Sequence, residues 1–271
     1  MKYANLDKQQ QLLESNINVS KDGDLKVFLR ACLKITFGIV CFVLIADLAA
    51  QYFILNMSVS TQQKIEDAIA SLMPIPSKSE EDFPLLETAN KIKERIVSDF
   101  DKDLPSDRFN FRVVNSKEAG ANAFVAPDGR IYFTKELLDL IGSDEEILAF
   151  VVAHEVGHYK NRDHLRKVGR GFIILGGSLL LSDAGSATYF SDFLFDLLTM
   201  GYSRDAEKKA DRYASDFMMK VYNSNRGAID FFTKSGDPDS QSKVNDYFSS
   251  HPSDKTRVKY LLKWGKENKE K

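Results

Sequence analysis

Two histidines and a glutamate stand close together at a spacing that suits metal chemistry. His154, Glu155 and His158 form the pattern H-E-x-x-H. Residues four apart share one face of a helix, so both imidazoles can point a ring nitrogen at one ion, with Glu155 beside them. A zinc ion lowers the pKa of a bound water to about 7, and a carboxylate can then take its proton. The pattern therefore predicts hydrolysis by a metal-activated water, with Glu155 as the catalytic acid and base.

Two residues compete for the third ligand position. His164 completes H-E-x-x-H-x-x-N-x-x-H, close to the metzincin pattern, with Asn161 where glycine is usual. It needs a break, because in a continuous helix His164 would lie about 15 Å further along the axis than His154. The rival is Glu207, and Asp211 four residues later could accept a hydrogen bond from the other nitrogen of a ligand histidine. The residues alone leave this choice open.

Four motifs occur in the order and approximate spacing of a known family. They are ANAFVAPDGRIYFTKELL, HEVGHYKNRD, SRDAEKKAD and SSHPSDKTRV, within about residues 85–265. The sequence thereby resembles the HtpX-like and CaaX-prenyl-protease-like zinc metallopeptidases, which are gluzincins with two histidines and a glutamate on the metal. HtpX-like enzymes typically have several membrane spans, whereas this chain offers one clear span, so a prenyl-protein substrate does not follow from the resemblance.

The resemblance implies a role for each matching residue. One zinc ion per chain is expected on His154, His158 and Glu207. Asp211 is expected to accept a hydrogen bond from the free ring nitrogen of a ligand histidine. His251, in the His-Pro motif, is expected to be a second catalytic residue that helps to hold the oxyanion.

Substrate contacts follow from the same resemblance. Asn122, Ala123 and Phe124 would lie on an exposed edge strand, to which an extended polypeptide can add as a further strand. Arg257 would brace the metal region or touch substrate. His164 becomes a surface histidine, because the family pattern continues the zinc helix through KNRD.

The elements that must position these residues can be read from apolar periodicity and turn signals. A helix is predicted over residues 143–161, where Ser143 and Glu146 stand at capping-box spacing. Other predicted elements are helices at 61–73, 84–104, 203–222 (capped by Ser203) and 253–270, a strand at 108–116, and a strand, turn, strand and short helix over 121–142. The expected fold class is α+β, mainly helical: a zincin-type metallopeptidase domain with a small β-sheet.

Two apolar stretches bear on the membrane. Residues 35–55, ITFGIVCFVLIADLAAQYFIL, have the length of about 20 needed to span a bilayer, although Asp47 and Gln51 interrupt them. Residues 171–181 are too short to span alone, and with residues 189–200 they favour a buried helical hairpin over a membrane-dipping lid.

The predicted organisation is a tail at 1–34, a transmembrane anchor at 35–55 and a zinc metallopeptidase domain at 57–271. Four cations lie between residues 21 and 34, whereas Lys64 is the first after the apolar segment. The positive-inside rule then places the N-terminus in the cytoplasm and the catalytic domain outside, in the periplasm if the protein is bacterial.

The composition bears on two further classes of protein, those that bind nucleic acid and those that hold zinc through cysteines. The net charge of -2 does not indicate a nucleic-acid partner, and the two cysteines, Cys32 and Cys41, provide no thiolate zinc site in the catalytic domain.

The expected function is a membrane-anchored zinc endopeptidase acting on misfolded or membrane-associated polypeptides. The alternatives are a zinc-containing chaperone or binding module that does not cut its clients, and a metzincin-type protease using His164. The sequence does not indicate an oligomeric state.

Overall fold

The structure is a computed structural model, and it describes residues 24–72, 79–80, 84–105, 107–114, 120–179, 193, 197, 200–234, 251, 257 and 259–264. The chain divides into two units, residues 1–49 and residues 50–271. The described residues of the first unit all belong to helix α2 (Asp24–Asn56), whose last turns belong to the second unit.

Helix α2 contains the predicted apolar span. Within the described residues it is the one helix long and apolar enough to cross a membrane, over Leu25–Asn56. Its large apolar side chains are exposed, for example Phe37 at 71% and Phe42 at 72%. Exposing such side chains to water is unfavourable by roughly 1.5–3 kcal/mol each, so an apolar environment would stabilise this surface.

The second unit holds a small sheet. Its strands are β1 (Ser79–Glu80), β2 (Phe111–Val114), β3 (Ala123–Val125) and β4 (Ile131–Thr134), in the order β1-β2-β4-β3. Strand β2 runs parallel to β4, and β3 runs antiparallel to it, with Ala123 opposite Phe133. The predicted turn between β3 and β4 is present: Gly129 adopts φ +85 and donates its N–H to Ala126. Strand β3 therefore forms one edge of the sheet.

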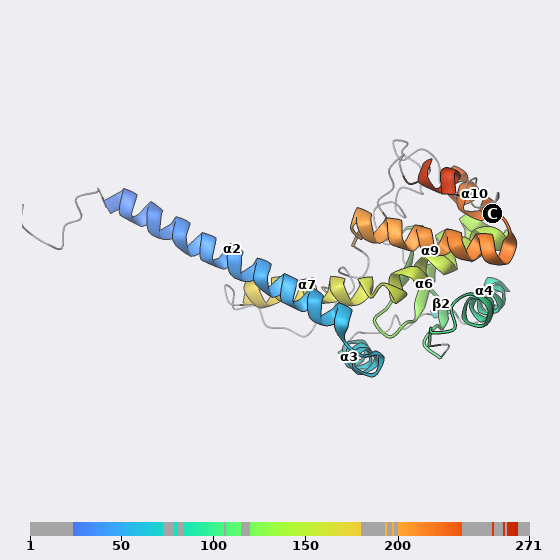
Figure 1. The fold of residues 1–271 in the computed structure, drawn as a ribbon, viewed down its shortest axis with the longest axis horizontal. Coiled ribbons are helices and arrows are strands. Elements are labelled where there is room, and N and C mark those ends of the chain that lie inside the picture. The colour runs from blue at the N-terminus through green and yellow to red at the C-terminus, as the bar shows by residue number, and fades with distance from the viewer. Residues whose placement is uncertain are drawn as a thin grey trace, which may run out of the picture. The chain divides into compact units, whose positions relative to one another are not determined.

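Helices surround this sheet (Figure 1). They are α3 (Val59–Leu72), α4 (Pro84–Arg95) with a π-helical turn η1 (Ile96–Phe100), α5 (Lys135–Ile141), α6 (Glu145–Lys160), α7 (Asp163–Leu179), α9 (Arg204–Tyr222) and α10 (Arg226–Lys234). The helix predicted at 84–104 thus ends earlier than expected, and the one predicted at 253–270 falls largely outside the described residues. Ser203 caps α9 as predicted, accepting a hydrogen bond from the N–H of Ala206.

Helix α6 lies at the centre of the core, with every residue from 147 to 159 buried. The predicted capping box of Ser143 with Glu146 is wrong, because Asp144 is the N-cap. Its carboxylate accepts hydrogen bonds from the N–H groups of Glu146 and Ile147, at 3.1 and 3.2 Å. A carboxylate at this position also interacts favourably with the positive end of the helix dipole.

The expectation that KNRD continues the zinc helix is wrong as well. Helix α6 ends at Lys160, and Arg162 adopts a left-handed conformation with φ 57 before α7 begins. The guanidinium of Arg162 donates to the carbonyl oxygens of Ile54 and Met57, at 2.6 and 3.0 Å. These bonds to the end of α2 hold the break in place.

Within the described residues, the buried hairpin expected over residues 171–200 is supported in part, because Leu197 is buried and its side chain would collide with a Cβ atom on Gly171. Helix α7 extends to Leu179, but Ile174 is 66% exposed and Phe172 is 38% exposed. Most of residues 180–199 lie outside the described residues, so the second arm of the hairpin stays a prediction.

Helices α6 and α9 approach closely along their length (Figure 1). A Cβ atom on Gly157 would come within 3.1 Å of the Cα atom of Ala210. Glycine at this position therefore allows the backbones to meet, and it brings Glu207, nearly one turn before Ala210, toward the two histidines of α6.

Candidate metal centre

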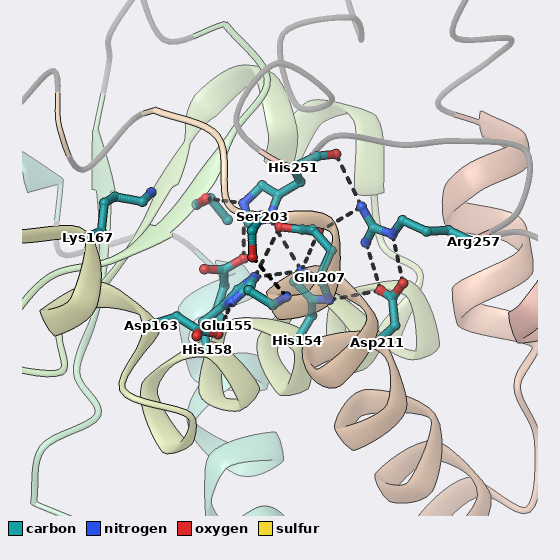
Figure 2. A network of polar contacts seen from close by, with 12 residues as sticks. His154, Glu155, His158, Asp163, Lys167, Ser203, Glu207, Asp211, His251 and Arg257 are labelled. Carbon is teal, nitrogen blue, oxygen red and sulfur yellow. Dashed lines mark hydrogen bonds and ion pairs between the residues drawn. The ribbon is translucent and has the colours of Figure 1, made fainter. Parts of the chain in front are cut away.

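Four side chains from three parts of the chain converge in the core (Figure 2). His154 and His158 come from α6, Glu207 comes from α9, and His251 follows much later in the chain. All four are buried, and one ligand atom of each lies within 4.8 Å of the others. The Nε2 atoms of His154 and His158 are 3.1 Å apart, and Glu207 lies 3.4 Å from each. This donor set could hold a metal ion.

Two carboxylates engage the outer nitrogens of the α6 histidines. Asp211 lies 3.1 Å from Nδ1 of His154, and Asp163 lies 2.9 Å from Nδ1 of His158. When each Nδ1 donates its proton to a carboxylate, both Nε2 atoms present lone pairs to one another. Such lone pairs repel unless a cation lies between them. Tetrahedral zinc ligands at 2.0–2.1 Å would stand about 3.3 Å apart, so the arrangement fits that ion.

Arg257 balances the two acids of α9. Its guanidinium holds Asp211 through two bonds of 2.7 Å and reaches Glu207 at 2.7 Å. Burial alone would raise the pKa of Glu207, but positive charge on His251 and Arg257 holds that pKa well below its usual range. Arg257 likewise outweighs burial to lower the pKa of Asp211. Both acids are therefore carboxylates, as a ligand and its supporting acceptor must be.

The metal-free cluster attracts a proton. Burial lowers the pKa of His154, but the hydrogen bonds and charges of Asp211 and Glu207 outweigh it and raise this pKa to about 9. A cation that binds here has to displace that proton.

Glu155 differs from the other acids of the cluster. It is fully buried, and neither carboxylate oxygen has a hydrogen-bond partner within the described part of the chain. Burial raises its pKa. A carboxyl group whose pKa moves toward neutrality is suited to accepting and returning a proton.

His251 connects the cluster to the sheet edge. Its Nδ1 lies 3.3 Å from Nε2 of His154 and 3.1 Å from Glu207. Its Nε2 lies 3.1 Å from the carbonyl oxygen of Ala123 and 3.5 Å from Glu155. His251 is thus positioned between β3 and the ligand atoms.

The predicted substrate strand is correct in topology and wrong in exposure. Strand β3 is an edge strand, but Asn122, Ala123 and Phe124 are all buried. Asn122 is bonded to the hydroxyl of Thr134, and Phe124 stacks on Tyr132. Ala123 contacts the cluster through its carbonyl oxygen, which lies 3.1 Å from Nε2 of His251.

The prediction that His164 is a surface histidine is wrong. His164 is fully buried on α7, and its Nε2 lies 3.1 Å from Glu66 of α3. It is absent from the group of converging ligand atoms. The left-handed Arg162 changes the direction of the chain, and this places His164 in a separate contact.

Three residues at the centre were not predicted. Asp163 supports His158, Gly157 allows the helices to approach, and Tyr202 stacks on His158 with ring centroids 3.9 Å apart. Asp163 was accessible to sequence reasoning, since a ligand histidine requires a partner for its other nitrogen. No local pattern marks Tyr202, because its contact depends on the path of the chain before α9.

The comparisons with known proteins agree with this geometry. The mitochondrial metalloendopeptidase OMA1 of Saccharomyces cerevisiae is 27% identical over 163 residues, which cover 58% of this chain and 47% of that protein. The chain thus matches about half the length of this relative. The model of peptidase family M48 matches residues 87–265, a range that includes every residue of the cluster. The chain belongs to peptidase family M48 and is a metallopeptidase.

Proposed function

We propose that this metallopeptidase is a membrane-anchored zinc endopeptidase, with one zinc ion held by His154, His158 and Glu207. The observation that carries the proposal is the pair of Nε2 atoms 3.1 Å apart, each with its outer nitrogen next to a carboxylate. Zinc prefers nitrogen and oxygen donors of this kind, and when bound it supplies a Lewis acid that activates water and polarises a carbonyl.

The residues around the ion would manage protons and charge. Glu155 would take a proton from water and pass it to the leaving amine, since its oxygens accept no hydrogen bond in the described structure and its pKa is raised by burial. Asp211 and Asp163 would keep the ligand histidines in the correct tautomer. Arg257 would act as a brace, because its guanidinium is bonded to Asp211, Glu207 and the carbonyl of His251.

Two roles are open to His251. As an oxyanion donor it would offer a ring N–H to the developing charge, a contribution of about 3–4 kcal/mol where such donors have been removed. As a further ligand it would use Nδ1, which lies 3.1 Å from Glu207. A His251→Ala chain separates them: a loss of turnover at full zinc content supports the oxyanion role, and a loss of zinc supports the ligand role.

The substrate would be a polypeptide that pairs with strand β3. Main-chain pairing at a sheet edge depends little on the substrate's sequence, which suits an enzyme that acts on misfolded or membrane-associated chains. The carbonyl oxygen of Ala123 is bonded to His251, and its second lone pair would accept the substrate N–H.

Helix α2 would anchor the enzyme, with the N-terminus in the cytoplasm and the catalytic domain on the other side. Its length and exposed apolar surface support a membrane span, and the cations that precede the apolar segment support this orientation.

The test uses the full chain in neutral detergent. Purified protein is expected to contain one zinc ion and to cleave casein until a chelator removes the metal. The matched variant is Glu155→Gln, which is expected to retain zinc and to lose about 10²–10⁴-fold in cleavage rate. If Glu155→Gln cleaves as fast as the natural chain while zinc stays bound, the peptidase mechanism fails. A protein that binds unfolded casein without cutting it would instead be the chaperone-like alternative.

A further inference from the structure

A cavity of about 410 Å³ lies beside the metal centre, between α7 and residues 200–206. Helix α7 lines it with residues 163, 166, 167, 170, 171 and 174, a spacing that places them on one face of the helix. Tyr202 forms part of the opposite wall and also stacks on His158. The peptidase chemistry proposed above does not use this cavity.

The end of the cavity near the start of α7 is basic. Arg166, Lys167 and Arg170 line it, and among the described residues of the cavity wall the one acidic side chain, Asp163, is already bonded to His158 and Arg166. The ammonium of Lys167 lies over the ring of Tyr202, 3.5 Å from its centre. Burial lowers the pKa of Lys167 to about 7, so a negative group beside it would restore its full charge. The hydroxyl of Tyr202 has no hydrogen-bond partner within the described residues and is a further donor.

The other end of the cavity is apolar. Ile174, Phe193, Leu197 and Met200 line it, and Ile174 and Met200 are more than half exposed. The cavity therefore combines a positive end with an apolar end, which matches an anionic amphiphile and does not match a free inorganic anion.

The location of α7 favours a membrane lipid over an acidic peptide. Helix α7 starts at the carboxyl end of the candidate span: Arg162 binds the carbonyls of Ile54 and Met57, and a Cβ on Gly169 would meet Ile54 at 3.2 Å. Arg170 is seven residues beyond Asp163, the first residue of α7, or about 10 Å along the helix. If α2 spans the bilayer, as proposed above, the basic residues lie within reach of the headgroups.

We infer that this cavity binds one anionic phospholipid, with its phosphate at Lys167 and Arg170 and an acyl chain along Ile174 and Leu197. The inference goes beyond the peptidase reaction and rests on the membrane anchoring in the proposed function. It requires no cleavage, so it can fail or succeed independently of catalysis.

The experiment measures lipid retained by the full chain. The protein is placed in nanodiscs of equal parts phosphatidylcholine and phosphatidylglycerol. Native mass spectrometry then releases it from the nanodisc and counts the lipids that remain bound. One phosphatidylglycerol per chain is expected, in preference to phosphatidylcholine. Lys167→Gln with Arg170→Gln is expected to weaken retention by about 30-fold, from about 1 kcal/mol for each cation near a membrane surface. Ile174→Asp is expected to weaken it too, because it places a charge along the acyl chain.

The matched control is Lys208→Gln with Lys209→Gln, two exposed positions of α9 that do not line the cavity. It removes the same charge and is expected to retain lipid as the natural chain does. Glu155→Gln is expected to retain lipid even if it cuts nothing. Equal retention of the two lipids, or an equal loss in the control, would overturn the inference. Displacement by millimolar inorganic phosphate, or by an acidic but not a neutral peptide, would also overturn it and would assign the cavity to a phosphate or to a substrate side chain.

Discussion

His158 and His164 are six residues apart, and both are fully buried beside a carboxylate, yet the two regions around them differ in what they can do. At His158, Asp163 occupies the outer nitrogen, and the inner nitrogen faces a second imidazole and Glu207. At His164, Nε2 is bonded to Glu66, and Nδ1 has no partner within the described residues.

The second region is a polar cluster around one acid, Glu66. Its carboxylate accepts hydrogen bonds from Gln62 at 2.7 Å and from the hydroxyl of Tyr159 at 3.0 Å, in addition to its contact with His164. The ring of Tyr159 stacks on His164, with centroids 5.0 Å apart. In this cluster several donors surround one acceptor. Because Tyr159 lies on α6 and His164 on α7, their contacts with Glu66 join both helices to α3. At the metal centre several acceptors converge, and only a cation or protons can satisfy them.

The largest effect should distinguish the two histidines directly. His158→Ala is expected to lose both zinc and activity, because it removes one of the converging donors. His164→Ala is expected to keep one zinc ion per chain, although it loses stability. Zinc content by elemental analysis of both variants checks this. Loss of zinc in His164→Ala with retention in His158→Ala would restore the metzincin-type assignment.

The acidity of the medium should affect the metal centre strongly. The pKa of His154 is raised to about 9 without metal, so zinc must displace a proton below that pH. Apparent zinc affinity is expected to fall about tenfold per pH unit, or about 100-fold between pH 8 and pH 6. In the metal-free chain the sign is opposite: this protonated histidine contributes stability that is complete below its unfolded pKa and is lost as the pH rises through 9.

Competition with a chelator at several pH values measures this slope, after correction for protonation of the chelator itself. A flat profile would show that His154 is already neutral in the metal-free chain. The affinity would then be governed by another group.

A carboxylate that is hydrogen-bonded to a ligand histidine should contribute less to zinc affinity than the ligand itself. Asp163→Asn is expected to lower zinc affinity about 10–100-fold, since it weakens the bond that fixes the tautomer of His158. Asp139→Asn, on α5, is the control and is expected to bind zinc as the natural chain does. An unchanged affinity in Asp163→Asn would mean that burial alone orients the His158 ring.

The smallest effect belongs to the polar cluster. Glu66→Gln is expected to reduce the free energy of unfolding by about 1–3 kcal/mol, because buried donors lose a charged acceptor, and to leave zinc content unchanged. Denaturant unfolding in neutral detergent measures it. The exposed pair of Glu87 with Lys91 provides a control, since solvent screens this pair and Glu87→Gln should leave the free energy of unfolding unchanged within error. Loss of zinc in Glu66→Gln would mean that the two regions are coupled across the α6–α7 junction.

Much of the fold could be predicted because it depends on local patterns. The helix carrying His154 and His158, the strand–turn–strand around Gly129 and the Ser203 cap all follow from spacing within a few residues. The errors occurred where two local signals compete. Ser143 and Asp144 are both good caps, and the choice between them depended on which side chain met the first turn.

The position of His164 shows more clearly what local sequence patterns cannot predict. Whether the chain after Lys160 continues as helix or turns is decided by Arg162, whose bonds are to residues more than 100 positions earlier. No periodicity within the segment carries that information. The exposure of β3 was likewise misjudged, because what covers an edge strand comes from distant parts of the chain.

The sequence by itself determined the chemistry that this protein can perform: two imidazoles one helical turn apart, an acid beside them and a second helix carrying Glu207 and Asp211. These follow from side-chain type and helical period, which are local properties. The residues alone left open which side chain joins the two histidines, although the family resemblance implied Glu207; the tertiary structure brings Glu207 to them and places His164 beside Glu66 instead. That choice depends on the close approach of α6 and α9 at Gly157 and on the turn at Arg162, both of which are set by packing between segments distant in the chain.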